Sequence, residues 1–216
     1  MSPCPVRAHI TSPSPRHRPS ADGVAPRLVP NVESTEHGVV GTRLRLATTD
    51  DVPALEALID RSVRSLSAPV YTPAQIAGAL AHIFGVDTQL LADRTYYVID
   101  AGDELVAAGG WSARQTLFGG DQMKSDTDLT IDPSTMPARI RAFFVRPDWA
   151  RRGLARRLYD ACQTAARERG FHRFELMATL PGVPLYRALG FTELEAVDVP
   201  MPSGLTLPCI RMGRTL

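Results

Sequence analysis

The sequence contains little cysteine and almost no lysine. Its cysteines, Cys4, Cys162 and Cys209, lie far apart among 216 residues, with no C-x-x-C pair and no histidine at metal-ligand spacing beside them. This distribution excludes a disulfide framework and a structural metal site, and reduced thiols favour a cytoplasmic location. Lys124 is the single lysine among 24 Lys and Arg residues, so arginine is used almost everywhere, and one arginine alone is weak support for a binding role.

Charge of one sign and long apolar runs are also lacking. The formal net charge is +1, which gives no bulk field to hold nucleic acid or an anionic membrane. No stretch of about 18 apolar residues is present, and the N-terminus lacks the apolar core of a signal peptide. We therefore predict neither a nucleic-acid partner nor a membrane span. A hydrophobic content of 44% is ample for one buried core.

Residues 1–40 differ in composition from the rest of the chain. They contain seven prolines and four arginines, with almost no apolar periodicity. Such a segment cannot bury enough apolar surface to offset the entropy of ordering, so we predict a disordered Pro-rich tail. Residues 41–216 are then predicted to form one domain.

Hydrophobic periodicity predicts a mixed order of strands and helices from Thr42 onward. We expect Thr48 or Thr49 and Thr72 to cap the first two helices. Gly109 and Gly110 mark a bulge or a close backbone approach, and residues 115–137 form a long loop. The expected elements are a strand at 42–47, helices at 48–63, 73–85 and 88–92, strands at 96–100, 104–114 and 138–145, a helix from 154, a strand at 173–179, a helix at 181–190, and an antiparallel pair at 191–199 and 205–212. This order predicts an α/β domain with a mixed sheet.

The most informative stretch runs from Phe143 to Gly170, where an apolar strand turns into a long amphipathic helix. Gly153 and Ala155 are small residues at the start of that helix, where backbone N–H groups can approach an anion. The same turn is crowded with arginines, although the helix dipole there favours negative charge. Those arginines are Arg151, Arg152, Arg156 and Arg157. We therefore predict a phosphate-bearing cofactor.

Two motifs at matching spacing resemble the GNAT superfamily of acyl-CoA-dependent N-acetyltransferases over residues 42–212. The first is Ala150-Arg151-Arg152-Gly153-Leu154-Ala155, which matches the family's Gln/Arg-x-x-Gly-x-Gly/Ala pattern except that Ala150 replaces the leading Gln or Arg. Arg151 could supply that charge from the next position. The second is LYRALGF, from Leu185 to Phe191, which resembles the family's closing motif.

The resemblance implies a fold and an activity. The fold is a mixed, mostly antiparallel sheet with a splayed central parallel strand pair and flanking helices. The activity is direct transfer of an acetyl group from the co-substrate acetyl-CoA to a primary amine, and near-neutral charge favours a small-molecule acceptor. Dimers are common in the superfamily, so the resemblance is compatible with a homodimer. The alternative is a non-catalytic acyl-CoA-binding sensor that regulates a partner.

The resemblance also implies which residues bind the cofactor. The turn before the helix would hold the pyrophosphate through backbone N–H groups, with Arg151 and Arg156 adding charge-assisted contacts. The pantetheine arm would pair with the open edge of the preceding strand, where an N–H of Phe144 or Val145 would polarise the thioester carbonyl. The cofactor-binding residues predicted in this way are Phe144, Val145, Arg151, Arg152, Gly153, Leu154, Ala155 and Arg156.

Tyr186, in the second motif, is the predicted general acid. A thiol ionises near pKa ~8.5 and a phenol near ~10, so the phenol keeps its proton until a thiolate leaves and can then donate it. The alternative is that Tyr186 only packs its helix on the sheet.

A general base and the acceptor-binding groups stay open in the sequence. The candidate bases are carboxylates on the following strand and in the long loop, namely Glu175, Asp126, Asp128 and Asp132. Trp111, Leu117 and Phe118, at the base of the long loop, are expected to be packing anchors rather than ligand contacts, although Phe118 is also a candidate for the acceptor site. The groups expected to line the acceptor site are Tyr71, His82, Phe118, Lys124 and Asp126.

Overall fold

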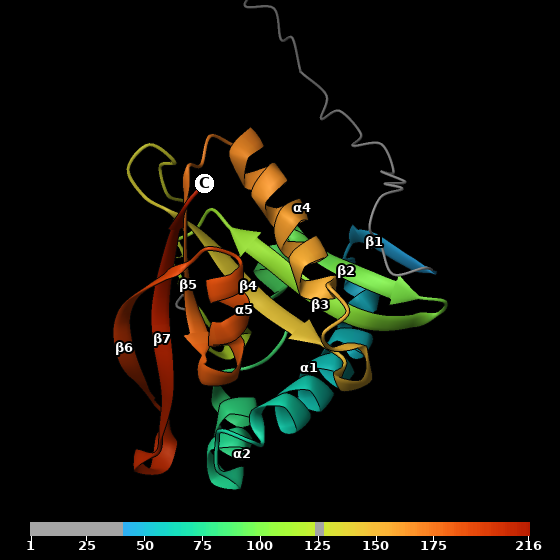
Figure 1. Ribbon diagram of the computed structural model, residues 1–216, viewed down its shortest axis with the longest axis vertical. Helices are drawn as coiled ribbons and strands as arrows, with labels where there is room; N and C mark the ends of the chain where they lie inside the picture. The colour runs from blue at the N-terminus through green and yellow to red at the C-terminus, as the bar shows by residue number, and fades with distance from the viewer. Residues whose placement is uncertain (1–40, 124–127) are drawn as a thin grey trace, which may run out of the picture. The chain divides into compact units, whose positions relative to one another are not determined.

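A computed structural model describes residues 41–123 and 128–216 (Figure 1). The tail predicted over residues 1–40 lies outside the described residues, as do Lys124 and Asp126. The strands are β1 Thr42–Leu46, β2 Tyr96–Ala101, β3 Glu104–Ser112, β4 Ala138–Val145, β5 Arg173–Thr179, β6 Thr192–Pro200 and β7 Thr206–Thr215. The helices are α1 Val52–Ser67, α2 Pro73–His82, α3 Thr88–Ala92, α4 Leu154–Glu168 and α5 Val183–Ala188.

Capping residues set the starts of the first two helical segments. The Thr48 N–H donates to the Asp51 carboxylate at 2.7 Å, and a short 3₁₀ turn then leads into α1. At α2, the Gln75 N–H donates to the Thr72 hydroxyl at 3.2 Å, and the Gln75 side chain accepts from the Thr72 N–H at 3.0 Å. Both arrangements are capping boxes, which satisfy N–H groups that a helix start leaves unpaired. The predicted caps are confirmed.

The strands form one sheet in the order β1-β2-β3-β4-β5-β7-β6. All neighbouring pairs are antiparallel except β4 and β5, which are parallel. The predicted mixed, mostly antiparallel sheet is therefore confirmed.

The parallel pair is joined at one end only. In this described part of the sheet, β4 and β5 register through Ala138 with Phe174 and Arg139 with Glu175, and the strands then diverge. An ion pair of 2.8 Å between Arg139 and Glu175 holds the joined end. The rest of β4, up to Val145, therefore presents a backbone edge that β5 does not cover.

Helices α1 and α4 cover opposite faces of the sheet. Side chains alternate between the faces along a strand, and Val98 packs in the cluster that contains Leu55 of α1, whereas its neighbour Ile99 packs with Leu158 of α4. In Figure 1, α4 crosses the near face of β3 and β4, and α1 lies toward the other side. The two helices thus approach the uncovered end of β4 from both faces.

The sequence of helix α4 predicts an apolar stripe of Leu154, Leu158, Cys162 and Ala165, and the structure buries it with one change. Leu154, Leu158 and Cys162 are buried as expected, but the next buried residue is Ala166, and Ala165 is only partly buried. Tyr159 is buried as well, so the buried face of α4 extends to the side of the predicted stripe on which Ala166 lies. Burial also raises the pKa of the Cys162 thiol, so this cysteine behaves as a small apolar side chain.

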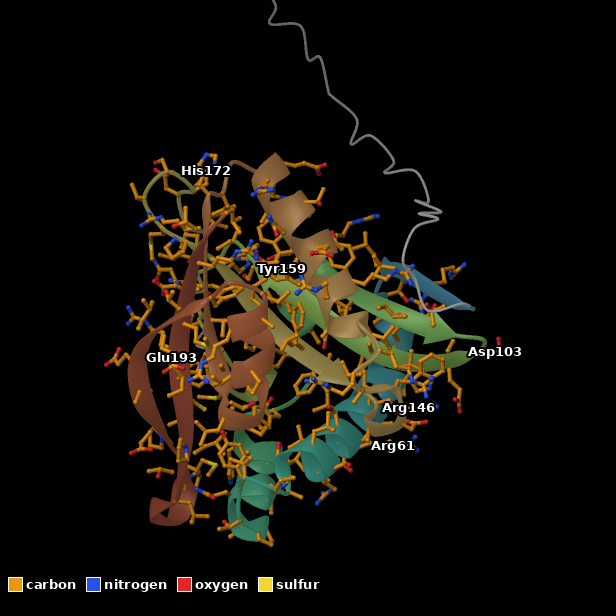
Figure 2. The ribbon with its side chains drawn as sticks, viewed as in Figure 1. Arg61, Asp103, Arg146, Tyr159, His172 and Glu193 are labelled. Atoms are coloured by element: carbon orange, nitrogen blue, oxygen red, sulfur yellow. The ribbon has the colours of Figure 1, made fainter. Side chains whose placement is uncertain are left out.

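Tyr159 extends the core under α4, where Figure 2 labels it. Its ring packs edge-on against Phe174 of β5 and Phe191, with ring centroids 5.9 and 5.8 Å apart. Its hydroxyl accepts a hydrogen bond of 2.8 Å from Arg214 on β7. This cluster fixes α4 to the C-terminal part of the sheet.

The glycine pair in β3 marks a bulge, as predicted. The register between β3 and β4 shifts between Ala108 and Gly110, and opposite the shift Ala142 adopts a φ of +54°. A Cβ on Gly109 would lie 2.7 Å from the Phe143 ring, and one on Gly110 would lie 2.9 Å from a backbone carbonyl. Glycine is favoured at these positions because a side chain would collide with the Phe143 ring or with the Thr95 carbonyl.

Candidate functional site

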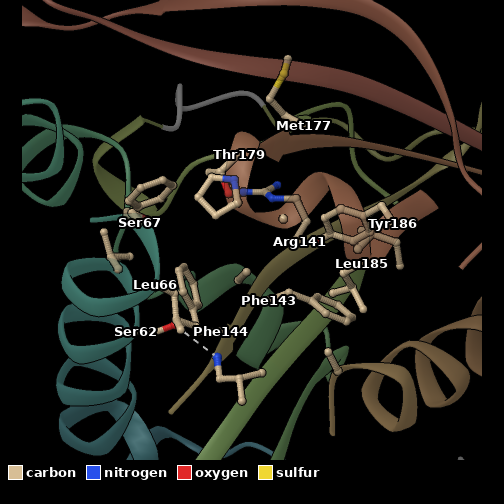
Figure 3. Close-up of a pocket in the computed structure, with 18 of the residues that line it drawn as sticks. Ser62, Leu66, Ser67, Arg141, Phe143, Phe144, Met177, Thr179, Leu185 and Tyr186 are labelled. Carbon is tan, nitrogen blue, oxygen red and sulfur yellow. Dashed lines mark hydrogen bonds between the residues drawn. The ribbon is translucent and has the colours of Figure 1, made fainter. Parts of the chain in front are cut away.

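A cavity of about 600 Å³ opens where β4 and β5 diverge. Its walls come from the end of α1, the turn after α2, the loop at 117–120, the exposed half of β4, the start of α4, and α5 (Figure 3). The wall is mainly apolar and aromatic. Its polar side chains, among the described residues, are those of Ser62, Ser67, Arg141, Arg151, Arg156, Thr179 and Tyr186, together with the indole of Trp149.

The turn before α4 presents unpaired backbone donors to this cavity. Arg151 and Gly153 both adopt positive φ, +63° and +80°, and Gly153 is the N-cap of α4. The first helical hydrogen bond runs from the Arg157 N–H to the Gly153 carbonyl at 3.1 Å. The N–H groups of residues 151–156 have no acceptor among the described residues. Successive free N–H groups at a helix start form an anion-binding concavity.

Two of the four arginines at this turn line the cavity. These are Arg151 and Arg156, and Arg156 also donates to the Ala188 carbonyl of α5 at 3.1 Å. This contact links the start of α4 to α5 across the mouth of the cavity.

The other two arginines point elsewhere. The Arg152 guanidinium stacks on the Trp149 ring, 4.8 Å from its centroid, and Arg152 is not among the cavity-lining residues. Arg157 donates to the Thr42 hydroxyl of β1 at 2.9 Å. The sequence did not separate these roles because all four arginines lie within two helical turns.

The uncovered edge of β4 directs one N–H group away from β3. The Arg146 N–H donates to the Val106 carbonyl of β3, so alternation along an antiparallel ladder turns the Val145 N–H outward and the Phe144 N–H back toward β3. The Val145 N–H donates to the Ser62 hydroxyl of α1 over 3.3 Å (Figure 3). Sequence reasoning missed Ser62; the available signal was a buried serine inside the apolar stripe of α1.

Tyr186 projects from α5 into the cavity wall. Its ring packs against Phe143 and Phe191, with centroids 6.4 and 5.7 Å away, and its relative exposure is 9%. Burial raises the pKa of the Tyr186 phenol above its ordinary value, and no hydrogen bond to another described residue contributes to the shift. The packing therefore holds the ring while the hydroxyl stays uncommitted.

A buried ion pair supports another part of the cavity wall. Arg141 of β4 lies 2.8 Å from Asp87, and both side chains are almost fully buried. Arg141 also donates to the carbonyls of Thr116 at 2.9 Å and of Gly119. This pair holds the loop at 117–120 against the cavity. Sequence reasoning missed it, although an arginine in the middle of an apolar strand is itself a signal, because a buried charge needs a partner.

The carboxylates considered as bases do not reach the cavity. Glu175 is paired with Arg139, Asp128 accepts from the Thr116 N–H at 2.9 Å, and Asp132 accepts from the Ser134 N–H at 2.8 Å. None of the three is a lining residue. These three candidates are therefore not supported by the geometry.

The expected acceptor-site residues are only partly correct. Phe118 lines the cavity, and so does Leu117, which was expected to be a packing anchor; Trp111 is buried in the core as expected. His82 is exposed at the end of α2 and lies outside the lining set. Aromatic and apolar residues at a loop base cannot be assigned to core or cavity before the partners across the loop are known.

Tyr71, also expected at the acceptor site, is instead a structural link. Its hydroxyl donates to the Pro208 carbonyl at 2.6 Å and accepts from the Leu180 N–H at 2.8 Å. Burial raises the pKa of its phenol. Tyr71 therefore fixes the segment between β5 and α5, which begins directly after the cavity-lining residue Thr179 of β5.

Metal clusters and membrane-spanning helices are both lacking in the part of the chain that the structure describes. No group of three or more His, Cys, Asp or Glu side chains is arranged there to hold a metal ion. No helix among the same residues has the length and apolar character required to cross a membrane.

Comparison with known proteins identifies the class to which this fold and cavity belong. The family model described as "Acetyltransferase (GNAT) family" matches residues 61–191, more than half of the chain. No curated protein sequence matches the chain.

Solved structures share the fold at low sequence identity. A GCN5-related N-acetyltransferase from Rhodopseudomonas palustris superposes with a TM-score of 0.60 and 19% identity, covering 84% of this chain and 100% of that one. PaiA N-acetyltransferase from Thermoplasma acidophilum, solved with coenzyme A, gives 0.57 and 12%, covering 81% and 99%. YncA from Salmonella typhimurium, solved with its cofactor acetyl-CoA, gives 0.53 and 19%, covering 82% and 94%.

The chain therefore belongs to the GNAT acetyltransferase family. The mixed sheet, the single parallel pair and the flanking helices are those of the GNAT fold.

Proposed function

We propose that this protein transfers an acetyl group from acetyl-CoA directly to a primary amine of a small-molecule acceptor. The observation that carries the proposal is the run of backbone N–H groups at residues 151–156, which have no acceptor among the described residues and of which all but Arg152 belong to residues that line the cavity. Arg151 and Arg156 line the cavity beside them. The family membership supplies the class of reaction.

The residues present fit the phosphate end of acetyl-CoA. A pyrophosphate offers several anionic oxygens, and free N–H groups at a helix start together with guanidinium groups are suited to bind them. A Cβ added at Gly153 would have no atom within 4 Å, so the approach to these N–H groups is open. The Arg152 side chain stacks on Trp149, so Arg152 would bind the pyrophosphate through its backbone N–H group. Leu154 and Ala155 would bind it through their backbone N–H groups in the same way.

The uncovered edge of β4 fits the arm that joins the phosphates to the acyl group. When bound, acetyl-CoA supplies a thioester, whose carbonyl accepts hydrogen bonds and whose sulfur leaves as a thiolate. The Val145 N–H is the donor that this edge directs away from β3, and its present partner is the Ser62 hydroxyl at the long distance of 3.3 Å. Phe144 lines the adjoining wall with its ring. The Val145 N–H would polarise the thioester carbonyl, and the Ser62 hydroxyl would give up its long hydrogen bond to that N–H.

Tyr186 is the proposed general acid. Its hydroxyl is held by no hydrogen bond to another described residue, and its ring is fixed by Phe143 and Phe191. Because burial raises the pKa of the phenol, Tyr186 retains its proton at neutral pH and can donate it to a leaving thiolate.

Replacing Gly153 with valine is expected to weaken acetyl-CoA binding about tenfold. A β-branched residue at φ +80° is strained by roughly 1–2 kcal/mol, and relief of that strain moves the N–H groups out of their common direction. The dissociation constant is measured by titration calorimetry. Gly102→Val is the matched control, because Gly102 has φ +61° in open space and lies outside the cavity lining. Equal affinities in the two variants would argue against this phosphate site.

The function itself is tested by combining calorimetry with an assay of CoA release. The proposal expects acetyl-CoA binding, and release of CoA that depends on an added amine. A second function, the acyl-CoA sensor, is favoured by one observation: the described cavity wall carries no carboxylate or imidazole that could act as a base. Binding without turnover of any amine in a broad panel would support the sensor and contradict the transferase.

A further inference from the structure

One end of the cavity lies away from the phosphate-binding turn and is built from apolar side chains. Leu66 of α1, Phe84 after α2, and Leu117 and Phe118 of the long loop line it. The Phe84 ring packs edge-on against Phe144 of β4, with centroids 6.1 Å apart. This end therefore lies beside the same part of β4 that is proposed to receive the thioester, which places it where an acceptor must enter.

Backbone hydrogen bonds hold this apolar end together. The Gly120 N–H donates to the Ile83 carbonyl at 2.9 Å, and the Asp121 N–H donates to the Val86 carbonyl at 3.2 Å. The loop is further fixed by Arg141, which donates to the Thr116 carbonyl. The aromatic surface is thus a built wall rather than a chance contact.

The described cavity wall carries no negatively charged side chain. Among the described residues that line the cavity, the charged side chains are Arg141, Arg151 and Arg156, with no Asp, Glu, His or Lys. Asp87 lies behind the wall with a relative exposure of 1%, and its carboxylate pairs with Arg141 at 2.8 Å and accepts from the Leu90 N–H at 3.3 Å.

A cationic amine would lose much of its hydration in this end without gaining a counter-charge. Burial of an unpaired ammonium group is strongly unfavourable, and the ion pair of Arg141 with Asp87 offers it no free counter-charge. An amine that is already uncharged avoids this cost. It also needs no base before attack, which agrees with a wall that carries none.

We propose that the acceptor is an aromatic amine, or a similarly apolar one, that is uncharged at neutral pH. This inference rests on the acetyl-transfer function proposed above. A bond forms between the amine nitrogen and the acetyl carbon while the carbon–sulfur bond breaks. The nitrogen gives up one proton and the thiolate gains one from Tyr186, which is reprotonated through solvent, so that an amide and a free thiol result.

The test uses two phenyl amines of similar size and the full-length protein. Aniline is uncharged at pH 7.5, whereas benzylamine is cationic. For aniline, kcat/KM is expected to be independent of pH between about 7 and 9. For benzylamine it is expected to rise about tenfold per pH unit over the same range, because only the free base enters. A polyamine, spermidine, is expected not to be acetylated.

A matched pair of variants places a carboxylate inside or outside the cavity. Leu66 and Val70 are both partly exposed, 37% and 48%, but only Leu66 lines the cavity. Leu66→Glu is expected to raise the benzylamine-to-aniline ratio of kcat/KM at least about tenfold by pairing with the ammonium group, whereas Val70→Glu leaves the ratio unchanged. Because a ratio is compared within each variant, a general loss of folded protein cancels.

The outcomes separate this inference from the function on which it rests. Turnover of spermidine but not aniline, or an unchanged ratio in Leu66→Glu, would overturn the inference and leave acetyl transfer standing. Failure of the wild-type protein to bind acetyl-CoA in calorimetry would overturn the function, and the inference with it.

Discussion

Replacing Tyr186 with phenylalanine is expected to lower kcat by about 100-fold or more while leaving the affinity for acetyl-CoA unchanged. General acid catalysis typically contributes 10²–10⁴-fold to a rate. The phenyl ring keeps the contacts with Phe143 and Phe191, and the lost hydroxyl makes no hydrogen bond to another described residue. The variant should therefore fold normally, and its defect should fall on the chemical step. Steady-state kinetics with calorimetry checks both parts.

Tyr159→Phe is the matched control for this experiment. Tyr159 is also a buried tyrosine, but its hydroxyl accepts from Arg214 and it does not line the cavity. Removing that hydroxyl should lower stability slightly and leave kcat near the wild-type value. A kcat of Tyr186→Phe that matched wild type would show that Tyr186 only packs α5 on the sheet.

The pH profile gives an independent check on the role of Tyr186. An acid is competent at every pH below its own pKa, and burial raises the pKa of the Tyr186 phenol above the ordinary value near ~10. The wild-type kcat should accordingly show no alkaline loss up to about pH 10. A loss centred near pH 8 would indicate that another group donates the proton.

Replacing Asp87 with alanine is expected to lower the free energy of unfolding by about 3–5 kcal/mol. The change leaves the Arg141 guanidinium buried without its counter-charge, and removing one partner of a buried pair costs about that much. Burial already lowers the pKa of Arg141, which reflects the desolvation that Asp87 offsets. Urea denaturation followed by circular dichroism measures the effect.

An exposed ion pair provides the contrast. Asp60 and Arg64 form an i,i+4 pair on α1, 2.9 Å apart and more than half exposed. Asp60→Ala should change the free energy of unfolding by less than about 0.5 kcal/mol.

A double variant of the buried pair, with Asp87→Leu and Arg141→Met together, should be less destabilised than Asp87→Ala, because no charge is then left unpaired. Equal losses in the single and double variants would contradict the ion-pair explanation.

The sequence was sufficient for the order of elements because that order depends on local patterns. Apolar periodicity, the threonine caps and the glycine pair in β3 all act within a few residues, and the elements, caps and bulge predicted from them are present in the structure, with bounds that differ by a few residues. The parallel pairing of β4 with β5 came from the family resemblance, since strand partners are not encoded by local periodicity.

The contacts that shape the cavity were missed where they join distant parts of the chain. Asp87 and Arg141 are separated by several strands and loops, and Ser62 meets Val145 from the first helix. No spacing rule links such residues, because only the folded sheet brings them together. His82 was expected at the acceptor site because the family resemblance implies a role for the first two helices, but its side chain is exposed at the end of α2.

The divergence of β4 from β5 also determines how firmly the two parts of the sheet are joined. The seven strands behave as two smaller sheets, β1–β4 and β5–β7, that share main-chain bonds only near Ala138 and Arg139. A molecule seated along the open edge of β4 supplies bonds across the gap that the backbone itself does not make. A ligand bound in the cavity would therefore join the two halves of the sheet by hydrogen bonds to β4. It should slow amide exchange along β4. It should also raise the melting temperature of the protein as the ligand concentration increases, by mass action.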